Sequence, residues 1–342
     1  MKTVAYLTGT RAEFGLMEKI LTGIPNLLLL ATGMHLLKEF GETITEVKVK
    51  FPQVKIIDTT YEEDSRLSMA KFLGKAVCGI VEILATEKPG IVLVLGDRSE
   101  QLAMAQAAAY LAIPIVHLHG GEETTTIDDK SRNAISMLAD WHLPASMGAA
   151  KKLTQMGIDK NKIKVIGAPG LDQIKDLPTP EKKDCLVVLQ HPDENEADAA
   201  QQIKSTLEAV LTFDLPIVVI YPNADAGGRS MIKVIKKYQS RVKIYPSLER
   251  NEFLLLLSRA KVLIGNSSAG LIESPSLNLP VVNIGPRQQG REQANNVINV
   301  NYEQAKITQA IQQALEMKLA NIKNPYGDGK TSQKVIKFLK SL

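Results

Sequence analysis

The segment IVLVLGDRSEQLAMAQAAAYLAIPIVHL, residues 91–118, contains the pattern on which the fold prediction rests. An apolar run at 91–95 precedes a Gly-Asp-Arg turn, a helical apolar pattern spans Glu100–Leu111, and a second apolar run follows at 115–118. Strand, helix and strand in this order are typical of a βαβ unit in a parallel sheet. The strand runs are apolar on both faces, as expected when helices cover both sides of the sheet.

The same alternation extends over the first half of the chain. The predicted strands are Val4–Leu7, Leu27–Ala31, Val54–Asp58, Ile91–Leu95, Ile115–Leu118 and Lys164–Ile166. The predicted helices are Ala12–Leu21, Ser65–Glu87, Glu100–Leu111, Asp129–Ala139 and Met147–Met156.

The alternation restarts after Gly167, beyond a segment rich in proline and charge, Asp172–Lys183, which is typical of a linker. The second set of predicted strands is Leu186–Leu189, Ile217–Ile220, Val242–Tyr245, Val262–Ile264 and Val281–Ile284. Its predicted helices are Ala197–Leu211, Gly228–Lys237, Arg250–Ala260, Gly270–Leu277 and Glu303–Leu315. The sequence thus predicts an α/β protein of two doubly wound, Rossmann-like domains, residues 1–170 and 171–330, that face a cleft.

The last segment, 331–342, has apolar residues at Val335, Phe338, Leu339 and Leu342. This spacing predicts a helix with one apolar stripe. Such a helix can dock on either half, and packing back on the N-terminal domain is one of these two arrangements.

The composition excludes several classes of protein. A net charge of +4 over 342 residues argues against general nucleic-acid binding, and it suits an anionic small substrate. Cys78 and Cys185 form no metal-binding or disulfide pattern, so we expect buried free thiols in a reducing cytosol. Without a leader or an apolar run long enough to span a bilayer, the sequence predicts a soluble cytoplasmic protein.

Polar clusters follow two of the strands in the first half. Thr8-Gly9-Thr10-Arg11 places an arginine at a helix start, where it either faces an anion or is a surface charge. Gly96-Asp97-Arg98 either forms a substrate-positioning pair or supplies a helix cap beside a surface charge.

The densest cluster runs from His117 to Glu123 and continues through 126–129 to Arg132. Two histidines spaced as HxH can bind a metal from one strand face, but no convincing third ligand is nearby. Acids next to an arginine fit general acid–base chemistry better, because such neighbours shift pKa values apart. One of Asp128 and Asp129 is expected to cap the following helix.

The second half has matching strand-end residues. Gln190-His191-Pro192 and the run 221–228 end two strands, and a lone histidine such as His191 is usually structural. The run 265–270, Gly-Asn-Ser-Ser-Ala-Gly, opens a helix and predicts a phosphate-binding site. Glu273 either accepts from ribose hydroxyls or is a first-turn dipole partner. Arg287 either binds a diphosphate or is a solvated loop charge.

Together these motifs resemble the UDP-N-acetylglucosamine 2-epimerases, a family with the GT-B fold, and more specifically its hydrolysing branch in sialic-acid-type sugar biosynthesis. The matching pieces are TGTRAEFG, LGDRSEQLA, HLHGGEETTTIDDKSRNAIS, LQHP, YPNADAGG, IGNSSAGLIESPSLNLPVVNIGPRQQGRE and NNV. They span nearly the whole chain, and the two long runs are the specific ones.

The resemblance implies a role for each motif. It places Asp97, His119, Glu122, Asp128 and Arg132 around the sugar as catalytic residues. It places Arg11, Arg98, His191, Asn223, Ser267, Ser268, Glu273 and Arg287 on the UDP part. It further implies elimination of UDP to a 2-acetamidoglucal, hydration to N-acetylmannosamine, no metal or cofactor, a UDP-sugar as the only small-molecule partner, and a homodimer or homotetramer.

One position departs from many relatives, which have Glu where this chain has His119. Either His119 is itself the acid–base group, which suits neutral pH, or Glu122 has that role. The change is also compatible with a different sugar, such as a bacillosamine derivative.

Three other functions stay open on the sequence. A non-hydrolysing epimerase would release no UDP, a GT-B glycosyltransferase would need an acceptor, and a sugar-nucleotide sensor would bind without turnover.

Overall fold

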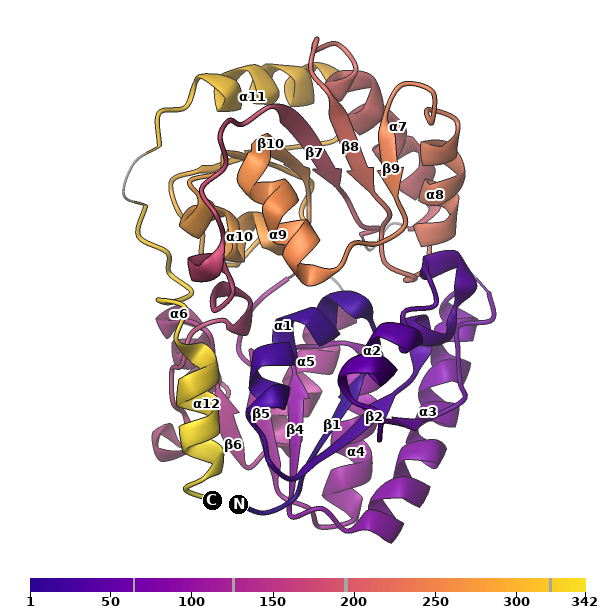
Figure 1. Cartoon of the computed structure of the whole chain (residues 1–342), viewed down its shortest axis with the longest axis vertical. Coiled ribbons are helices and arrows are strands. Elements are labelled where there is room, and N and C mark those ends of the chain that lie inside the picture. The colour runs from indigo at the N-terminus through magenta and orange to yellow at the C-terminus, as the bar shows by residue number, and fades with distance from the viewer. Residues whose placement is uncertain (64, 125–126, 194–195, 320–321) are drawn as a thin grey trace. The chain divides into compact units, whose positions relative to one another are not determined.

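The computed structural model describes residues 1–63, 65–124, 127–193, 196–319 and 322–342 (Figure 1). The chain divides into two compact units. Unit 1 comprises Met1–Glu123, Ile127–Asp172 and Tyr326–Leu342, and unit 2 comprises Gln173–Pro325 together with Thr124. The chain therefore leaves unit 1 after Asp172 and returns to it at Tyr326. The boundaries expected from the sequence were residues 170 and 330.

Unit 1 contains a six-stranded sheet in which every neighbouring pair is parallel. The strand order is β3-β2-β1-β4-β5-β6. All residues of β1 and β4 are buried, which matches their continuous apolar sequence. The strands are β1 Val4–Thr8, β2 Leu27–Ala31, β3 Lys55–Ile56, β4 Ile91–Leu95, β5 Ile115–Leu118 and β6 Trp141–Leu143.

Helices cover both faces of this sheet. Side chains of α1, α2 and α12 form one buried core with the strands, and α3, α4 and α5 pack in sequence on the other side (Figure 1). The helices are α1 Arg11–Thr22, α2 Ile44–Lys50, α3 Arg66–Glu87, α4 Ser99–Tyr110, α5 Ile127–Leu138, α6 Met147–Gln155 and α12 Thr331–Leu339.

Unit 2 repeats this architecture with a second parallel sheet of six strands in the order β12-β11-β10-β7-β8-β9. Helices α7, α8 and α11 pack on one face, and α9 and α10 contribute to the core on the other. The strands are β7 Cys185–Leu189, β8 Ile217–Ile220, β9 Lys243–Tyr245, β10 Ala260–Gly265, β11 Val281–Ile284 and β12 Val297–Val300. The helices are α7 Ala199–Val210, α8 Gly228–Lys236, α9 Arg250–Arg259, α10 Ala269–Ile272 and α11 Gln304–Glu316.

The predicted fold class is confirmed, because each sheet is a doubly wound Rossmann-like sheet. In both, the first two strand-to-strand crossovers run one way and the next ones run the other way. The direction changes between β1 and β4 in unit 1, and between β7 and β10 in unit 2. Ligands of such sheets bind at the carboxyl ends of the strands at this switch point.

Helix α12 packs on unit 1 although it closes the sequence. Val335, Phe338 and Leu339 are buried in the core of that unit, and the Phe338 ring meets Trp141 edge-on at 5.5 Å. The carboxylate of Asp172 accepts hydrogen bonds from the first backbone amides of the helix, at Thr331 (2.8 Å) and at Ser332. The stripe seen in the sequence is therefore the buried face of the helix.

The strand prediction for Lys164–Ile166 is wrong. The sixth strand of unit 1 is β6, and Ile163 forms only an isolated bridge to its central residue, His142. A three-residue strand with histidine in the middle has too short an apolar run to be recognised. Strand β12 and the seven-residue helix α2 were not predicted either.

Two smaller predictions also need correction. The expected helix Gly270–Leu277 is split into α10 and a 3-10 turn, Ser274–Leu277, because Pro275 cannot donate the next helical hydrogen bond. Cys185 is buried as expected, but Cys78 is exposed. In α3 the buried positions, from Phe72 to Leu84, recur every fourth residue, and Cys78 lies outside that stripe.

Among the described residues, no helix is both long and apolar enough to cross a membrane.

Candidate active site

The two strands at the switch point of unit 1 end in the first two polar clusters. Thr10 caps α1, with its hydroxyl accepting from the Glu13 amide at 3.2 Å. Arg11 follows and is paired with Glu46 of α2, the Nε–Oε2 distance being 2.6 Å. Arg11 thus lies at the expected strand end, held by a carboxylate rather than surrounded by water.

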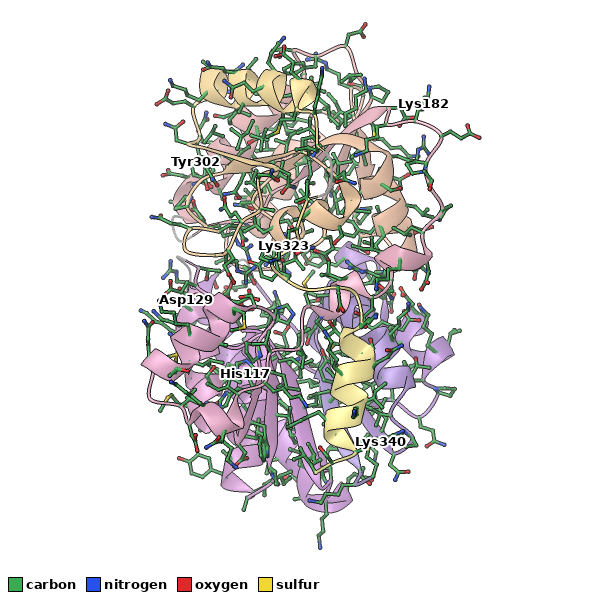
Figure 2. The ribbon with its side chains drawn as sticks, turned by 90° about the vertical axis from the view of Figure 1, so that its left-hand side faces the viewer. His117, Asp129, Lys182, Tyr302, Lys323 and Lys340 are labelled. Atoms are coloured by element: carbon green, nitrogen blue, oxygen red, sulfur yellow. The ribbon has the colours of Figure 1, made fainter. Side chains whose placement is uncertain are left out.

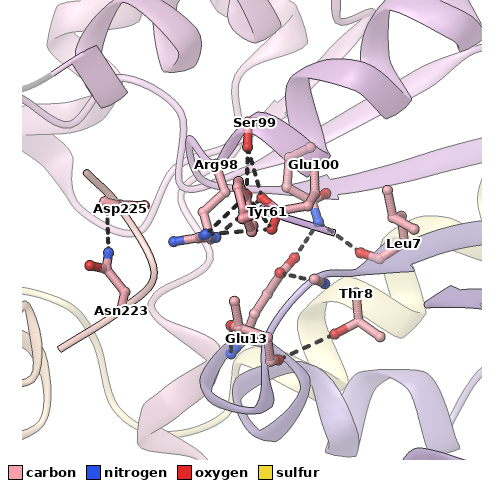
Figure 3. Close-up of polar contacts among 12 residues, drawn as sticks. Leu7, Thr8, Glu13, Tyr61, Arg98, Ser99, Glu100, Asn223 and Asp225 are labelled. Carbon is pink, nitrogen blue, oxygen red and sulfur yellow. Dashed lines mark hydrogen bonds and ion pairs between the residues drawn. The ribbon is translucent and has the colours of Figure 1, made fainter. Parts of the chain in front are cut away.

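Two buried carboxyl groups lie between these strand ends (Figure 3). Glu13 accepts hydrogen bonds from Tyr6 Oη at 2.9 Å, from the Gly9 amide at 3.1 Å and from the Gln101 side chain. Burial, reinforced by the nearby charge of Glu100, raises the pKa of Glu13 to about 8.

Glu100 is the second of these groups, and it is fully buried. Its carboxylate accepts from Tyr61 Oη at 2.9 Å, from Ser99 Oγ at 3.2 Å and from Arg98 Nε at 3.2 Å (Figure 3). A Cβ on Gly9 would lie 2.5 Å from Glu100 Oε1, so this turn requires glycine. Arg98 is therefore fixed by a buried partner at the carboxyl end of β4.

Asp97 is not the helix cap that one interpretation expected. Helix α4 is capped at Arg98, while the Asp97 carboxylate accepts a charge-assisted hydrogen bond from Arg132 Nη2. Arg132 also donates from Nη1 to Asp129 Oδ1 at 2.5 Å and to the Glu122 carbonyl at 2.8 Å. Asp97 and Arg132, both predicted at the sugar but not as partners, are thus brought together across 35 residues of sequence.

Arg132 is fully buried, and its charge is maintained by these neighbours. Burial opposes the charged form, but Asp97, Glu122 and Asp129 outweigh it and raise the pKa of Arg132 above its ordinary value. The guanidinium is therefore a fixed positive charge paired with the carboxylates of Asp97 and Asp129.

His119 and Glu122 form a close pair on the turn after β5. His119 Nδ1 lies 2.9 Å from Glu122 Oε1, and both side chains are largely buried. His119 has φ +61°, a left-handed conformation that non-glycine residues seldom adopt, and such strain is concentrated at functional sites. Because an ionised carboxylate can only accept, this contact favours the hydrogen on Nδ1, and in the neutral form of the ring Nε2 is then an acceptor.

His117 has a structural role instead. Its Nε2 donates to the Gly96 carbonyl at 2.8 Å, and its Nδ1 accepts from Ser136 Oγ at 3.1 Å. Burial lowers its pKa to about 3. Because His117 lies within β5 and His119 follows its end, the two rings do not share a strand face as the HxH alternative required. Among the residues that the structure describes, no three His, Cys, Asp or Glu side chains are grouped to hold a metal ion.

Asp128 and Asp129 both lie in the first turn of α5. Of the two, Asp129 pairs with Arg132, although the sequence did not single it out as catalytic (Figure 2 labels Asp129). Asp128 is half-buried one residue earlier, and Thr126 of the same motif lies outside the described residues.

In unit 2, three predicted residues meet around Asn266, which directly follows β10. The His191 amide donates to Asn266 Oδ1 at 2.7 Å, and Asn266 Nδ2 donates to the His191 carbonyl at 2.9 Å. The Asn223 amide donates to His191 Nδ1 at 3.1 Å, and Arg287 Nη1 donates to the Asn266 carbonyl at 3.2 Å. Arg287 is therefore anchored at a strand end and is not merely a solvated loop charge.

The predicted phosphate-binding helix is shorter than expected. Helix α10 has four residues, and its N-cap Ser268 makes no side-chain cap bond. Ser267 Oγ accepts from the Ala269 amide at 3.4 Å. So short a helix has a small dipole, which leaves the serines and the backbone amides as the groups that can bind an anion.

Glu273 is neither in the first turn of a helix nor exposed. It closes α10, and its Oε1 accepts from Arg250 Nη2 at 2.8 Å, with both side chains almost completely buried. Arg250 Nε donates in turn to Gln173 Oε1 at 3.0 Å. The first-turn dipole interpretation is therefore wrong.

Comparison with known proteins gives the family. The family model described as UDP-N-acetylglucosamine 2-epimerase matches residues 23–340. The chain belongs to the UDP-N-acetylglucosamine 2-epimerase family.

Two relatives illustrate its range. The UDP-N,N'-diacetylbacillosamine 2-epimerase (hydrolyzing) of Legionella pneumophila is 39% identical over 100% of this chain and 96% of its own. A UDP-N-acetylglucosamine 2-epimerase of Neisseria meningitidis serogroup B is 32% identical, over 99% and 94%. The crystal structure of the Methanocaldococcus jannaschii UDP-GlcNAc 2-epimerase with UDP-GlcNAc and UDP has a TM-score of 0.83 at 21% identity, covering 99% of this chain and 100% of that one, and so shares the fold.

Several residues of this epimerase-family site were not singled out from the sequence. Glu13 and Glu100 lie inside quoted motifs, but each resembled an ordinary first-turn acid. Tyr61 and Arg250 come from segments without a motif, and only the folded chain places them on Glu100 and Glu273.

Proposed function

We propose that this chain is a hydrolysing 2-epimerase that converts UDP-N-acetylglucosamine into UDP and N-acetylmannosamine, a precursor of sialic-acid-type sugars. The observation that carries the proposal is the His119–Glu122 pair at 2.9 Å on one turn, next to the buried Arg132 that binds Asp97. An acceptor nitrogen, several carboxylates and a fixed cation are the groups that proton transfer at carbon requires.

The reaction divides into two steps. In the first, the proton leaves C2, a C1–C2 double bond forms, and the C1–O bond breaks with its electrons going to UDP. In the second, water adds its hydroxyl to C1 of the 2-acetamidoglucal, and C2 receives a proton on the opposite face. The products are UDP and the free sugar inverted at C2.

The contacts suggest a role for each group of unit 1. Glu122 holds the Nδ1–H of His119, so His119 Nε2 is the acceptor offered to a C2 proton, much as a carboxylate orients the histidine of a catalytic triad. Asp97 and Asp128 are proposed to supply the opposite proton and to activate water. Arg132 orients the Asp97 carboxyl group.

The nucleotide is proposed to bind through arginines, hydroxyls and backbone amides. The arginines are Arg11, Arg98 and Arg287, and the hydroxyls are those of Ser267 and Ser268. His191, Asn223 and Glu273 complete the proposed set. Positive side chains and fixed N–H groups stabilise a leaving diphosphate, so no metal or redox cofactor enters the proposed steps.

A second substrate is favoured by one observation. The Legionella relative, named for hydrolysis of UDP-N,N'-diacetylbacillosamine, is 39% identical over the whole chain, compared with 32% for the Neisseria enzyme named for UDP-N-acetylglucosamine. UDP-N,N'-diacetylbacillosamine is therefore the second substrate to test, with the same chemistry at C1 and C2.

Product analysis in deuterated water tests the function. Either UDP-sugar, without any acceptor, should give free UDP and a free sugar that carries deuterium at C2 and has the inverted configuration. An epimerised UDP-sugar without net release of UDP would instead identify a non-hydrolysing enzyme. No consumption of either substrate despite binding would favour a sensor, and consumption only with an acceptor would favour a glycosyltransferase.

Two variants assign the acid–base group. His119→Asn keeps a residue that tolerates the left-handed backbone but removes the ring, and Glu122→Gln can reverse the tautomer of His119. If the pair acts as proposed, both should lower kcat by about 10²–10⁴-fold. A His119→Asn enzyme with nearly wild-type kcat beside an inactive Glu122→Gln enzyme would show that Glu122 acts on the sugar directly.

A further inference from the structure

Asn266 forms hydrogen bonds through its amide, its carbonyl and both polar atoms of its side chain. It is fully buried directly after β10, and its amide donates to the Leu189 carbonyl of β7 at 3.3 Å. The preceding Gly265 has φ +134°, and a Cβ there would lie 2.1 Å from the same carbonyl. Glycine thus allows β10 to approach β7 closely enough for the Asn266 side chain to reach the next residues.

The side chain of Asn266 binds both backbone groups of one residue. Its Oδ1 accepts from the His191 amide at 2.7 Å, and its Nδ2 donates to the His191 carbonyl at 2.9 Å. These two hydrogen bonds resemble the pair that neighbouring residues exchange in a β-sheet, although both strands have ended before this point. It fixes the φ and ψ of His191 without touching the imidazole.

The imidazole of His191 is fixed by a separate contact. The Asn223 amide donates to Nδ1 at 3.1 Å, and because a backbone amide can only donate, Nδ1 is an acceptor and Nε2 carries the hydrogen of the neutral ring. Nε2–H is thereby the donor of this ring. Its direction depends on the backbone that Asn266 holds.

The carbonyl of Asn266 anchors the next strand end as well. Gln288 Nε2 donates to it at 2.8 Å and Arg287 Nη1 at 3.2 Å. These bonds use the main chain, so they can survive removal of the Asn266 side chain. The side chain acts on His191, and the carbonyl acts on Arg287.

We propose that Asn266 is a positioning residue that sets the direction of the His191 Nε2–H donor, and that it does not contact the ligand itself. The proposal rests on the proposed function in one respect, namely that His191 binds the nucleotide. It revises the expectation that the whole 265–270 run lines a phosphate site.

The chain offers a matched control in Asn296. It is also fully buried in unit 2, and its Nδ2 donates to the Leu279 carbonyl at 2.7 Å and to Ser274 Oγ at 2.8 Å. Asn296→Ala should lower the melting temperature about as much as Asn266→Ala, without changing His191. Any effect that is only structural should therefore occur in both variants.

The experiment has two measurements on the full-length protein. Nitrogen-15 NMR of the ligand-free protein reports the tautomer of His191, which should be the Nε2–H form in the wild type and in Asn296→Ala and a mixture in Asn266→Ala. Calorimetry with UDP should show about tenfold weaker binding for Asn266→Ala and less than twofold for Asn296→Ala. In a His191→Gln background, Asn266→Ala should change the affinity for UDP less than twofold.

Each outcome decides a separate point. An unchanged His191 tautomer in Asn266→Ala would overturn the positioning role, and so would a tenfold loss of UDP affinity that persists in the His191→Gln background. A wild-type protein that does not bind UDP would instead refute the proposed function, while the NMR comparison would still test the role of Asn266.

Discussion

Gly121 lies on the turn that joins His119 to Glu122, and the structure gives a quantitative reason why no other residue fits there. Its φ is +82°, and a Cβ would lie 2.2 Å from the Ala149 carbonyl oxygen and 2.8 Å from Leu153 Cγ, both in α6. The backbone carbonyl of a helix cannot turn aside as a side chain can. Gly121→Ala must therefore displace either α6 or the turn.

The expected cost has two parts. A left-handed alanine costs about 1–2 kcal/mol, and overpacking against a fixed backbone adds about 1–3 kcal/mol. Gly157, which follows α6, separates them, because its φ is +89° and nothing lies within 4 Å of its Cβ. Gly157→Ala should show the backbone cost alone. Gly74 of α3 has neither problem, so Gly74→Ala should stabilise the exposed helix by about 0.5–1 kcal/mol.

Calorimetric melting of the three variants tests this order. At about 2–4 °C per kcal/mol, Gly121→Ala should melt about 6 °C below Gly157→Ala, and Gly74→Ala should melt slightly above the wild type. Because a misplacement of about 1 Å can cost about 100-fold in rate, Gly121→Ala should also lose most of its UDP-releasing activity, while Gly157→Ala keeps it. Equal melting temperatures for Gly121→Ala and Gly157→Ala would refute the steric reasoning.

The remaining predictions concern unit 1. Burial lowers the pKa of His117 to about 3 and of His35 and His142 to about 4, all below the ordinary 6.5, so their contribution to stability is lost as pH falls below 6.5. The raised pKa of Glu13 acts in the opposite sense, because its contribution to stability grows as pH falls from about 8. Glu13 offsets one of the three histidines, so the net loss should be about 2 kcal/mol between pH 6 and 5. Equal stability in urea unfolding at the two pH values would contradict this. Asp172→Ala removes the acceptor of two α12 amides and should cost about 1–2 kcal/mol in the same assay, and an unchanged stability would show that apolar packing alone holds the helix.

The central strands were predictable because of where they lie. Strands β1, β4 and β7 are covered on both faces, so nearly every residue is apolar and the run is easily recognised in the sequence. Strand β12, in contrast, has no fully buried residue, and an edge position imposes little on its sequence. The positions of the polar clusters followed from the topology, because the carboxyl ends of parallel strands lie at the same edge of the sheet.

The partners of the site residues were less predictable. That Asp97 and Arg132 would meet could be guessed from two neighbouring strand ends, but the choice of Asp129 over Asp128 depends on the rotation of α5 about its axis. The pairing of Arg250 with Glu273 joins two helices that share no motif, and it is decided by packing alone. Sequence therefore predicts which residues gather at an edge better than which of them bond to each other.

The two histidines at the strand ends show why the partners matter more than residue type. His119 donates from Nδ1 to a carboxylate, so Nε2 of its neutral ring is an acceptor. His191 accepts at Nδ1 from a backbone amide, so its Nε2 is a donor. The same side chain is thus proposed as a base in unit 1 and as an anion-binding group in unit 2. Removing a C2 proton requires the first state and holding a diphosphate requires the second, so the two hydrogen-bond directions support the roles proposed for His119 and His191.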